Sequence, residues 1–274
     1  MKSSFRRWGS GWIPALEAGT GVAVDGKTGR CSRSIECGPR YLVSALASGI
    51  AVVLGQEAAA EKSNEITAIP LLLQTLAIKG AMVTMHAVRT HAPIAQVVQD
   101  KQADYVLAMK DNQPHLAESI RAGFATAGRA GEALGNVRHD YYVTVEKNHG
   151  RIEVRRYYAF RHPECLSHPA QWLGLRRFGV VQSGRTRKDK TCTEVRLCIG
   201  GIAPEARELA HALRSHWAVA NRLHWCLDVC LNDDQARAKN SAAHLAAVRR
   251  TVLKFFRPDK SRKGGIKARH LVLP

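Results

Sequence analysis

The sequence predicts a mixed α/β fold, because segments with the two-residue period of strands alternate with segments that have the period of amphipathic helices. The chain has 274 residues, and 45% of them are apolar. A chain of that length and composition can bury a substantial core and is not expected to be disordered. It is long enough for one large domain, or for a core domain that carries an insertion.

The first strand-like segments form a meander. Residues 21–25 (GVAVD) predict a short strand that ends at a carboxylate and is followed by a Gly-Lys-Thr turn. Two apolar runs, 41–49 and 50–58, meet near Ser48, which predicts a hairpin. Three strands are therefore expected before the first helix.

Helices and strands then alternate. The pattern predicts, in order, a helix over 65–78 that contains Pro70, a strand over 81–87, a helix over 93–101, a strand over 103–110 and a helix over 114–126. An antiparallel meander followed by strands joined through crossover helices is the ribonuclease-H-like arrangement. The sequence thus predicts a ribonuclease-H-like mixed sheet flanked by helices.

The second half of the chain has a different pattern of apolar residues. Residues 138–200 show period-two segments, which predict a β-rich insertion before one last long helix over 204–231. We divide the chain into an N-terminal segment, two parts of the core separated by that insertion, and a basic tail. The boundaries are 1–20, 21–127, 128–203, 204–256 and 257–274.

The charge balance points to a polyanionic partner. The chain has 41 Lys and Arg against 23 Asp and Glu, a formal charge of +18. Neutralising phosphates releases their condensed counterions, which favours binding of such a protein to nucleic acid. Composition leaves open DNA, RNA, an anionic membrane surface, or solubility alone. No run approaches the roughly 18 apolar residues that span a bilayer, and the first residues lack the apolar region of a signal peptide. A cytoplasmic location is expected, with association to the nucleoid when DNA is bound.

Asp25 is the leading candidate for chemistry. A carboxylate at the end of the first strand would lie at the edge of an α/β sheet where ligands bind. A turn aspartate is the alternative reading of the same spacing.

Five segments resemble a known family. VAVDGKTGRCS, VLGQEAAAEKSNEITAIPLLLQTLAIKGAMVTMHA, DYVLAMKDNQ, HGRIEVRRYY and HWAVANRLHWCLDV are similar, in this order, to the DDE transposases of H-repeat insertion sequences. The resemblance implies a ribonuclease-H-like fold and three acids that hold two Mg²⁺ or Mn²⁺ ions. Such ions activate the attacking oxygen and stabilise the leaving one as phosphodiester bonds are cut and rejoined. The resemblance begins near FRRW at residues 5–8, so we expect an upstream domain of the family to be absent.

Mapped residue by residue, the family's acids are only partly present. The first falls on Asp25, the second on His86, and the third on Ala220. An imidazole is a poor substitute for a carboxylate on Mg²⁺, and an alanine side chain has no donor atom. The resemblance therefore implies a shortened, catalytically inactive copy in which Asp25 is the remaining metal ligand.

Basic residues are the candidates for DNA contact. They are Lys27, Arg151, Arg155, Arg156, Arg185, Arg187, Lys188, Lys190, Arg214 and His216. A strand that carries arginines four residues apart presents them on one face, where they can follow a phosphate backbone. A solvated strand face is the alternative. In the late helix, Trp217 and Trp225 are interpreted as core anchors, with base stacking as the alternative.

Two hypotheses for the function follow. The first is an insertion-sequence transposase fold that binds double-stranded DNA at the ends of the element, as a homodimer, without cutting it. The second is a non-enzymatic basic DNA-binding protein that interferes with intact transposases. A nuclease that uses Asp25, His86 and another acid with a softer metal is a further alternative.

Overall fold

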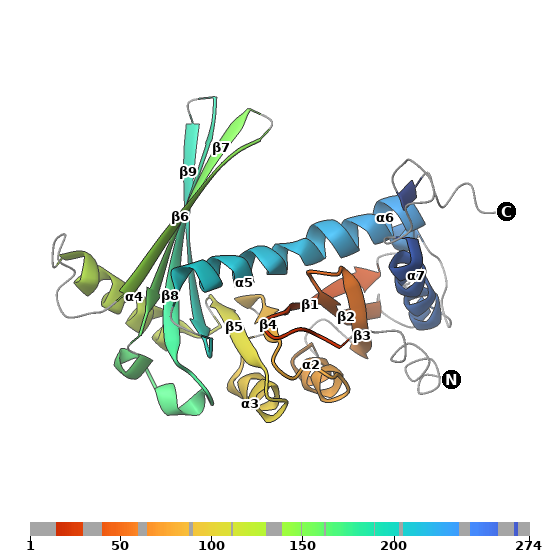
Figure 1. Ribbon diagram of the computed structural model, residues 1–274, viewed down its shortest axis with the longest axis horizontal. Coiled ribbons are helices and arrows are strands. Elements are labelled where there is room, and N and C mark those ends of the chain that lie inside the picture. The colour runs from red at the N-terminus through yellow and green to blue at the C-terminus, as the bar shows by residue number, and fades with distance from the viewer. Residues whose placement is uncertain are drawn as a thin grey trace. The chain divides into compact units, whose positions relative to one another are not determined.

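The computed structural model resolves the chain into two compact units, residues 1–81 with 215–274, and residues 82–214. The structure describes residues 15–29, 40–59, 65–87, 90–110, 112–129, 139–148, 150–161, 163–188, 190–202, 205–235, 242–256 and 266–267. The basic tail from 257 and the segment at 1–14 therefore lie largely outside the described residues. Figure 1 shows the elements of both units. Among the described helices, none is long and apolar enough to cross a membrane.

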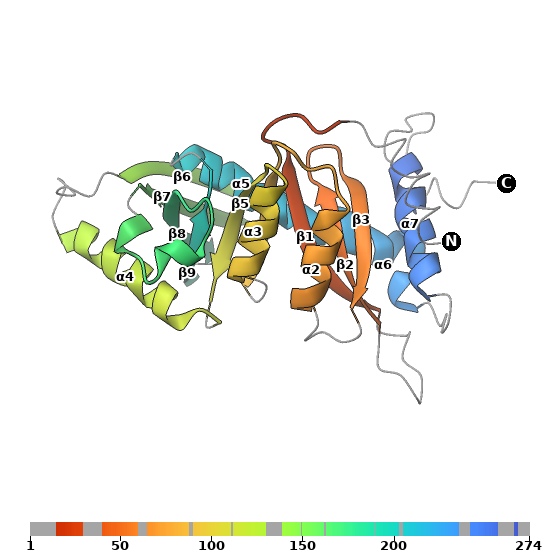
Figure 2. The same cartoon turned by 90° about the horizontal axis from the view of Figure 1, so that it is seen from below.

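The first unit contains the predicted meander. Its strands β1 (Gly21–Gly29), β2 (Arg40–Ala47) and β3 (Val52–Ala59) are antiparallel, in the order β3-β2-β1. Helix α2 (Glu65–Gln74) packs on one face, where Leu72 and Leu76 approach Gly55 of β3. Figure 2 shows α2 lying across these strands. The hairpin between β2 and β3 and the helix are confirmed.

The opposite face of this meander packs against the last helical segments. They are the π-helical segment η6 (Val219–His224), α6 (Trp225–Leu231), the short η7 (Asp233–Gln235) and α7 (Ala242–Phe256). Ala23 and Leu46 of the sheet share an apolar cluster with Val219, Leu223 and Leu227. Alternate residues of β1 therefore face these helices.

Two sequence predictions about this unit are wrong in detail. Strand β1 does not end at Asp25 but continues to Gly29, because residues 25–29 pair with Ser44 to Arg40 of β2. The late helix is not uniformly α-helical. The backbone N–H of Trp225 donates to the Ala220 carbonyl, five residues back, which marks the π turn. Such turns insert an extra residue into a helix and recur at functional sites.

The second unit is a larger mixed sheet in the order β4-β5-β9-β8-β7-β6. Strands β4 (Met82–Met85) and β5 (Asp104–Met109) are parallel, and the remaining pairs are antiparallel. The other strands are β6 (His139–Asn148), β7 (Arg151–Phe160), β8 (Arg177–Arg187) and β9 (Lys190–Gly200). The last four lie within the range predicted to be β-rich, while the division of the chain into domains stays a prediction.

Helices cover the base of this sheet on both faces. Helix α3 (Ala92–Asp100) packs on β5 and α4 (Pro114–Arg129) on β8, with the short turns η4 (Pro163–Cys165) and η5 (Pro169–Gln171) following β7. Helix α5 (Ala206–Ala218), whose residues up to 214 belong to this unit, packs on the other face. An Asp140 carboxylate oxygen accepts the Ala206 N–H at 2.7 Å and so caps the start of α5.

The fold class is therefore the predicted one. A three-stranded antiparallel meander precedes strand, helix, strand and helix along the chain, and helices flank the sheets. This is the element order of the ribonuclease-H-like class, with four antiparallel strands inserted before the last long helix.

Candidate functional site

Asp25 lies in the middle of β1, on the face that looks toward η6 and α6. Its Cα is paired with that of Ser44 in β2. Side chains alternate along a strand, so Ala23, Asp25 and Lys27 share this face. The Asp25 side chain is only 14% exposed. The predicted first acid is thus held within packed structure rather than at a loop.

One side chain beside Asp25 is that of His224. Its Nδ1 lies 3.6 Å from Asp25 Oδ2, at the end of the π turn. Burial lowers the pKa of His224, and the neighbouring Asp25 carboxylate opposes that effect only in part. Burial therefore favours the neutral form of the imidazole. This contact gives Asp25 an imidazole nitrogen as a neighbour, not a carboxylate.

Lys27, two residues along β1, lies among aspartates. Its Nζ is 2.7 Å from Asp228 Oδ1, 2.5 Å from Asp234 Oδ1 and 4.0 Å from Asp233 Oδ2. The Lys27 side chain is only 9% exposed. Lys27, Asp228, Asp233 and Asp234 form what we call the lysine–aspartate cluster. The predicted role of Lys27 in DNA binding stays a prediction, and a phosphate would have to compete with these carboxylates for the ammonium group.

Two arginines of α7 support this cluster. Arg249 donates to Asp233 Oδ1 at 3.0 Å. The buried Arg250 donates to Ser44 Oγ at 3.2 Å and to the Ala246 carbonyl at 3.0 Å. Burial lowers the pKa of Arg250 to about 10, while Asp233 favours its charged form. The acids at the end of α6 thus tie α7 to the sheet.

The other two positions implied by the resemblance have no carboxylate. Ala220 is an exposed residue of the π turn in the first unit. His86 directly follows β4 in the second unit and is also exposed. The catalytic roles of Asp25, His86 and Ala220 therefore remain predictions.

The donor atoms at these positions do not fit a pair of Mg²⁺ ions. Mg²⁺ prefers oxygen ligands in octahedral geometry, and two such ions need several anionic oxygens. Asp25 supplies one carboxylate, His86 an imidazole and Ala220 a methyl group. Within the described ranges, no group of three or more His, Cys, Asp or Glu side chains is arranged to hold a metal ion. The acids nearest to β1 already surround the Lys27 ammonium group.

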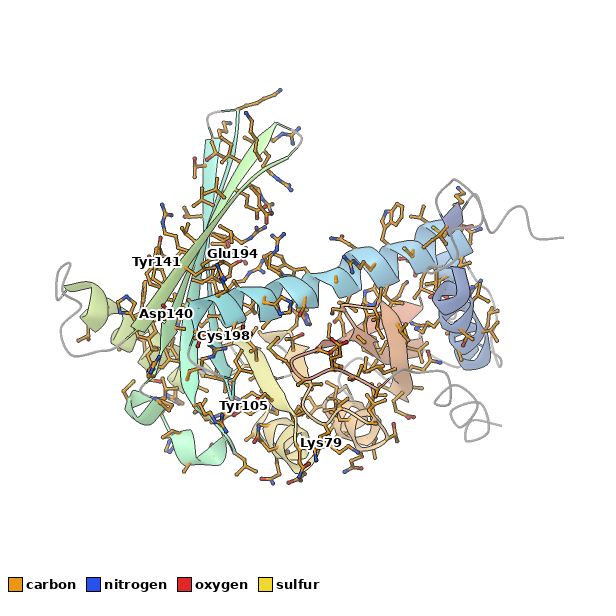
Figure 3. The ribbon with its side chains drawn as sticks, in the orientation of Figure 1. Lys79, Tyr105, Asp140, Tyr141, Glu194 and Cys198 are labelled. Carbon is orange, nitrogen blue, oxygen red and sulfur yellow. The ribbon has the colours of Figure 1, made fainter. Side chains whose placement is uncertain are left out.

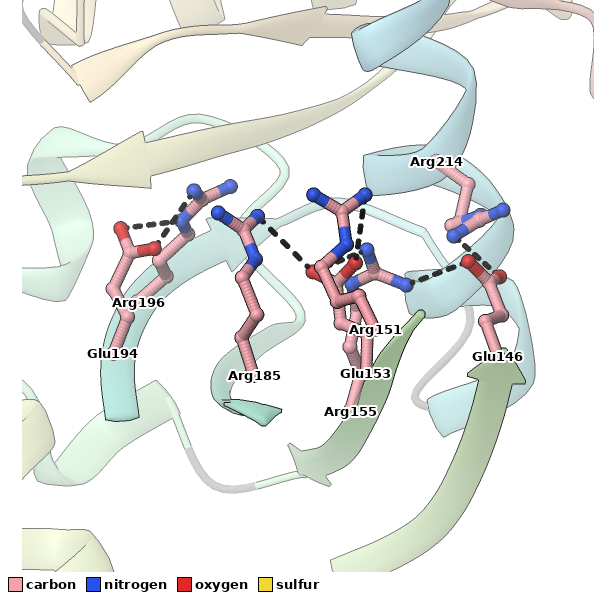
Figure 4. A network of polar contacts seen from close by, with 8 residues as sticks. All are labelled: Glu146, Arg151, Glu153, Arg155, Arg185, Glu194, Arg196 and Arg214. Carbon is pink, nitrogen blue, oxygen red and sulfur yellow. Dashed lines mark hydrogen bonds and ion pairs between the residues drawn. The ribbon is translucent and has the colours of Figure 1, made fainter. Parts of the chain in front are cut away.

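A second polar feature, which we call the arginine network, lies in the second unit on β6 to β8 and α5. Its members are Glu146, Arg151, Glu153, Arg155, Arg185 and Arg214 (Figure 4). Glu153 contacts Arg155 at 2.6 Å, Arg185 at 3.4 Å and Arg151 at 4.0 Å. Glu146 contacts Arg214 at 2.6 Å and Arg155 at 3.2 Å.

Strand register explains this network. Glu146 lies directly opposite Glu153 on β7, and Glu153 lies opposite Arg185 on β8. Two opposed carboxylates would repel each other unless cations separate them. Arg155, which is 5% exposed, contacts both. Although burial raises the pKa of Glu146, hydrogen bonds from Arg214 and Arg155 lower it overall. Four arginines against two glutamates leave an excess of positive charge.

The remaining predicted DNA contacts are dispersed. Arg156 is exposed and, by alternation, points to the face opposite the arginine network. Arg187, Lys188 and Lys190 are exposed at the far end of the β8–β9 hairpin. His216 is buried in α5. The structure therefore gathers Arg151, Arg155, Arg185 and Arg214, and leaves the others outside that group.

Sequence reasoning missed several of these contacts. No local pattern placed Asp228, Asp233 and Asp234 beside β1, yet all three lie within 4.0 Å of Lys27 Nζ. The available signal was the alternation that puts Lys27 on the same strand face as Asp25. Trp225 is 57% exposed, so its interpretation as a core anchor is wrong.

Comparison with known proteins gives consistent similarities. Residues 20–253 match the family model described as a transposase DDE domain. The chain is 36% identical over 254 residues to YncI of Escherichia coli O157:H7, which carries a transposase name, covering 90% of this chain and 64% of that protein. It is 35% identical over 255 residues to YhhI of Escherichia coli K12, named as an H-repeat-associated transposase, covering 90% and 66%. The chain thus spans about two thirds of the length of these relatives.

A solved structure shares the fold. A piggyBac transposase, in a cryo-EM structure of its synaptic complex with hairpin DNA, aligns with a TM-score of 0.51 at 9% identity. The alignment covers 93% of this chain and 51% of that one.

Proposed function

The chain belongs to the family of transposase DDE domains, and on that premise we propose that it binds double-stranded DNA at insertion-sequence ends without cutting it. In this proposal the protein keeps the fold and the cationic surface of a transposase. Metal-dependent phosphodiester transfer, the activity that the resemblance implies for the family, is lost. Two copies act together as a homodimer.

The setting of Asp25 carries the proposal of lost chemistry. A two-metal site requires anionic oxygens that converge on the reacting phosphate. Here one contact of Asp25 is the His224 imidazole at 3.6 Å, whose neutral form burial favours, and the positions of the other two acids hold His86 and Ala220. The nearby aspartates bind Lys27 instead. A metal ion would have to displace an ammonium group that already neutralises them.

The arginine network supports the proposed DNA contact. Arg151, Arg185 and Arg214 are 42%, 55% and 41% exposed, and the two glutamates do not balance them and Arg155. Guanidinium groups held in place by carboxylates keep donors available for phosphate oxygens. Such contacts position a duplex without reading its sequence.

A metal-binding experiment tests the loss of chemistry. Calorimetric titration of the purified protein with Mn²⁺ and Mg²⁺ is expected to give no saturable binding, and supercoiled plasmid is expected to remain uncut with either ion. Saturable binding or plasmid nicking by the unaltered chain that disappears in Asp25→Asn would refute the proposal.

A salt titration tests the DNA contact. The slope of log affinity against log salt reports the number of phosphates neutralised, at about 0.9 per phosphate. The variant Arg151→Gln/Arg185→Gln is expected to lower that slope by about 2 and to weaken duplex binding on the order of tenfold. The matched control Lys79→Gln/Arg121→Gln removes the same charge from exposed positions elsewhere. Equal losses in both variants would show that only net charge matters.

A further inference from the structure

Strand β6 is the edge of the sheet in the second unit. Over the residues that the structure describes, it pairs along its whole length with β7 and is the last strand in the order. An edge strand presents unpaired backbone N–H and C=O groups, which form a template for another strand. The strand, HDYYVTVEKN, contains neither proline nor glycine and is rich in β-branched and aromatic residues.

The side chains of β6 expose apolar surface along this edge. Tyr141, Val143 and Val145 point to the face opposite α5 and are 46%, 42% and 67% exposed. Tyr142, on the other face, packs against the cluster that includes α5. Figure 3 labels Asp140 and Tyr141 on this strand. Soluble proteins usually protect such an edge with charges, prolines or bulges. Here Lys147 is the one cation on the apolar face of the strand.

Side chains on the face beside this edge are also exposed among the described residues. Near the base of the sheet, Phe124 of α4 packs edge-on against Tyr158 at 5.1 Å between ring centroids. Farther along the strands, Ile152 of β7 and Val195 of β9 are 43% and 57% exposed. Ile152 is paired with Lys147 of β6, whereas Arg156 and Gln182 lie between Val143 and Val195 in the sheet register. The exposed apolar group beside the edge is therefore Tyr141, Val143, Val145 and Ile152, and such a group marks an interaction surface.

A second copy of β6 fits the edge in one register. When two identical strands pair antiparallel about a two-fold axis perpendicular to the sheet, the register centred on Thr144 sets Val143 opposite Val145. In the same register Tyr141 lies opposite Lys147 and Tyr142 opposite Glu146, so no like charges meet.

The neighbouring register is less favourable. Centred on Val143, it would set Asp140 opposite Glu146 and His139 opposite Lys147. Two carboxylates directly opposite each other are destabilising. The register centred on Val145 also avoids like charges, but it pairs only residues 142–148 of each strand, whereas the register centred on Thr144 pairs residues 140–148. Strand overlap and side-chain complementarity together therefore favour the register centred on Thr144.

We propose that two copies of this chain associate through antiparallel pairing of β6 with β6, centred on Thr144. The proposal names the surface of the proposed homodimer and does not depend on DNA binding, because the association is tested without DNA. Since a two-fold axis perpendicular to the sheet keeps its faces, both arginine networks would lie on the same side of one continuous sheet. Two linked cationic surfaces bind one duplex more tightly than either alone.

Sedimentation velocity over a wide range of protein concentration, without DNA, tests the association. The unaltered chain is expected to shift from monomer to dimer as its concentration rises. Val145→Lys adds a desolvated charge at the pairing edge and is expected to raise the dimer Kd by at least about tenfold. The matched control Val195→Lys changes a valine of similar exposure on β9, on the same face, and is expected to leave the Kd unchanged. A chain that stays monomeric, or a control that dissociates while Val145→Lys does not, would overturn the proposal.

Cysteine cross-linking tests the register. In a background with Cys31, Cys37, Cys165 and Cys192 changed to serine, Val143→Cys and Val145→Cys proteins are each oxidised alone and as a mixture. Opposed Cβ atoms in a non-hydrogen-bonded antiparallel pair lie close enough to form a disulfide. The mixture is expected to form covalent dimers, whereas each protein alone is not. Cross-linking of Val143→Cys protein with itself would instead indicate the register centred on Val143 and would overturn the assignment.

Discussion

The lysine–aspartate cluster and the arginine network are both ion-pair groups, but their charge balance is opposite. In the first, the ammonium of Lys27 and the guanidinium of Arg249 meet three aspartates. In the second, four arginines meet two glutamates. Lys27 is 9% exposed, whereas Arg185 is 55% exposed. In the first group the buried ammonium is neutralised by the aspartates that hold the fold together. In the second group the exposed guanidinium groups exceed the glutamates, so we expect their positive charge to be available to a polyanion.

Removing the cation from the first group should have the largest effect. Lys27→Met leaves Asp228 and Asp234 without their shared partner, and breaking a partly buried pair costs about 3–5 kcal/mol. We expect a fall of that size in the free energy of unfolding, measured by urea titration with tryptophan fluorescence as the signal. The control Lys79→Met, on an exposed turn, should change stability by less than about 0.5 kcal/mol. Equal stability of both variants would mean that the cluster does not hold this unit together.

Removing the central anion of the second group should lower stability by less than Lys27→Met does, and it should strengthen DNA binding. Glu153→Gln weakens the anchoring of Arg155, and we expect a loss of about 1–3 kcal/mol. It also frees positive charge, so binding to a nonspecific duplex should become tighter, as measured by fluorescence anisotropy. Glu118→Gln on α4 makes the same charge change at an exposed residue. Weaker duplex binding by Glu153→Gln would show that arginine geometry outweighs charge.

The first unit should be sensitive to acid through His224. Burial lowers the pKa of this imidazole in the folded chain, so unfolding takes up a proton as the pH falls below its ordinary value of 6.5. The stabilisation is present above that pH and is lost below it, with a slope of at most about 1.4 kcal/mol per pH unit. His224→Gln should flatten the slope in urea titrations at successive pH values, whereas His115→Gln at an exposed site should not. A slope unchanged in His224→Gln would assign the acid sensitivity to other groups.

The smallest effect is expected for an ion pair outside both groups. Arg196 donates to Glu194 through Nε at 2.8 Å and Nη2 at 3.0 Å, and these bonds lower the pKa of the glutamate. Both side chains are largely exposed, so Glu194→Gln should cost only about 0.2–1 kcal/mol. A loss as large as that of Lys27→Met, measured by the same urea unfolding, would remove the contrast between buried and exposed ion pairs.

Most of the fold was predictable because it depends on local periodicity. The meander, the hairpin at Ser48, the alternating helices and strands to α4, and the β-rich segment were all visible as runs of apolar residues. The errors arose where tertiary contacts override local signals. Gly26 suggested a turn, yet β1 continues past it because β2 pairs with it residue by residue. The late helix has a regular apolar pattern, and that pattern does not predict the π turn at Val219–His224.

The candidate site was only partly predictable for the same reason. Asp25, His86 and Ala220 came from a resemblance, which assigns positions but not their surroundings. Arg151 and Arg155 could be placed on one strand face by alternation. Their partners Glu146 and Arg214 come from another strand and a helix, at sequence distances that no local pattern spans.

By itself, the sequence determined the element order, the family, the excess of positive charge and the absence of carboxylates at positions 86 and 220. The tertiary structure alone decided which charges meet: Lys27 with the aspartates at the end of α6, His224 with Asp25, and four arginines with two glutamates. The physical reason is the sequence distance over which each effect acts. Periodicity and side-chain type act over a few residues, whereas the energy of an ion pair depends on distance and burial between groups far apart in the chain.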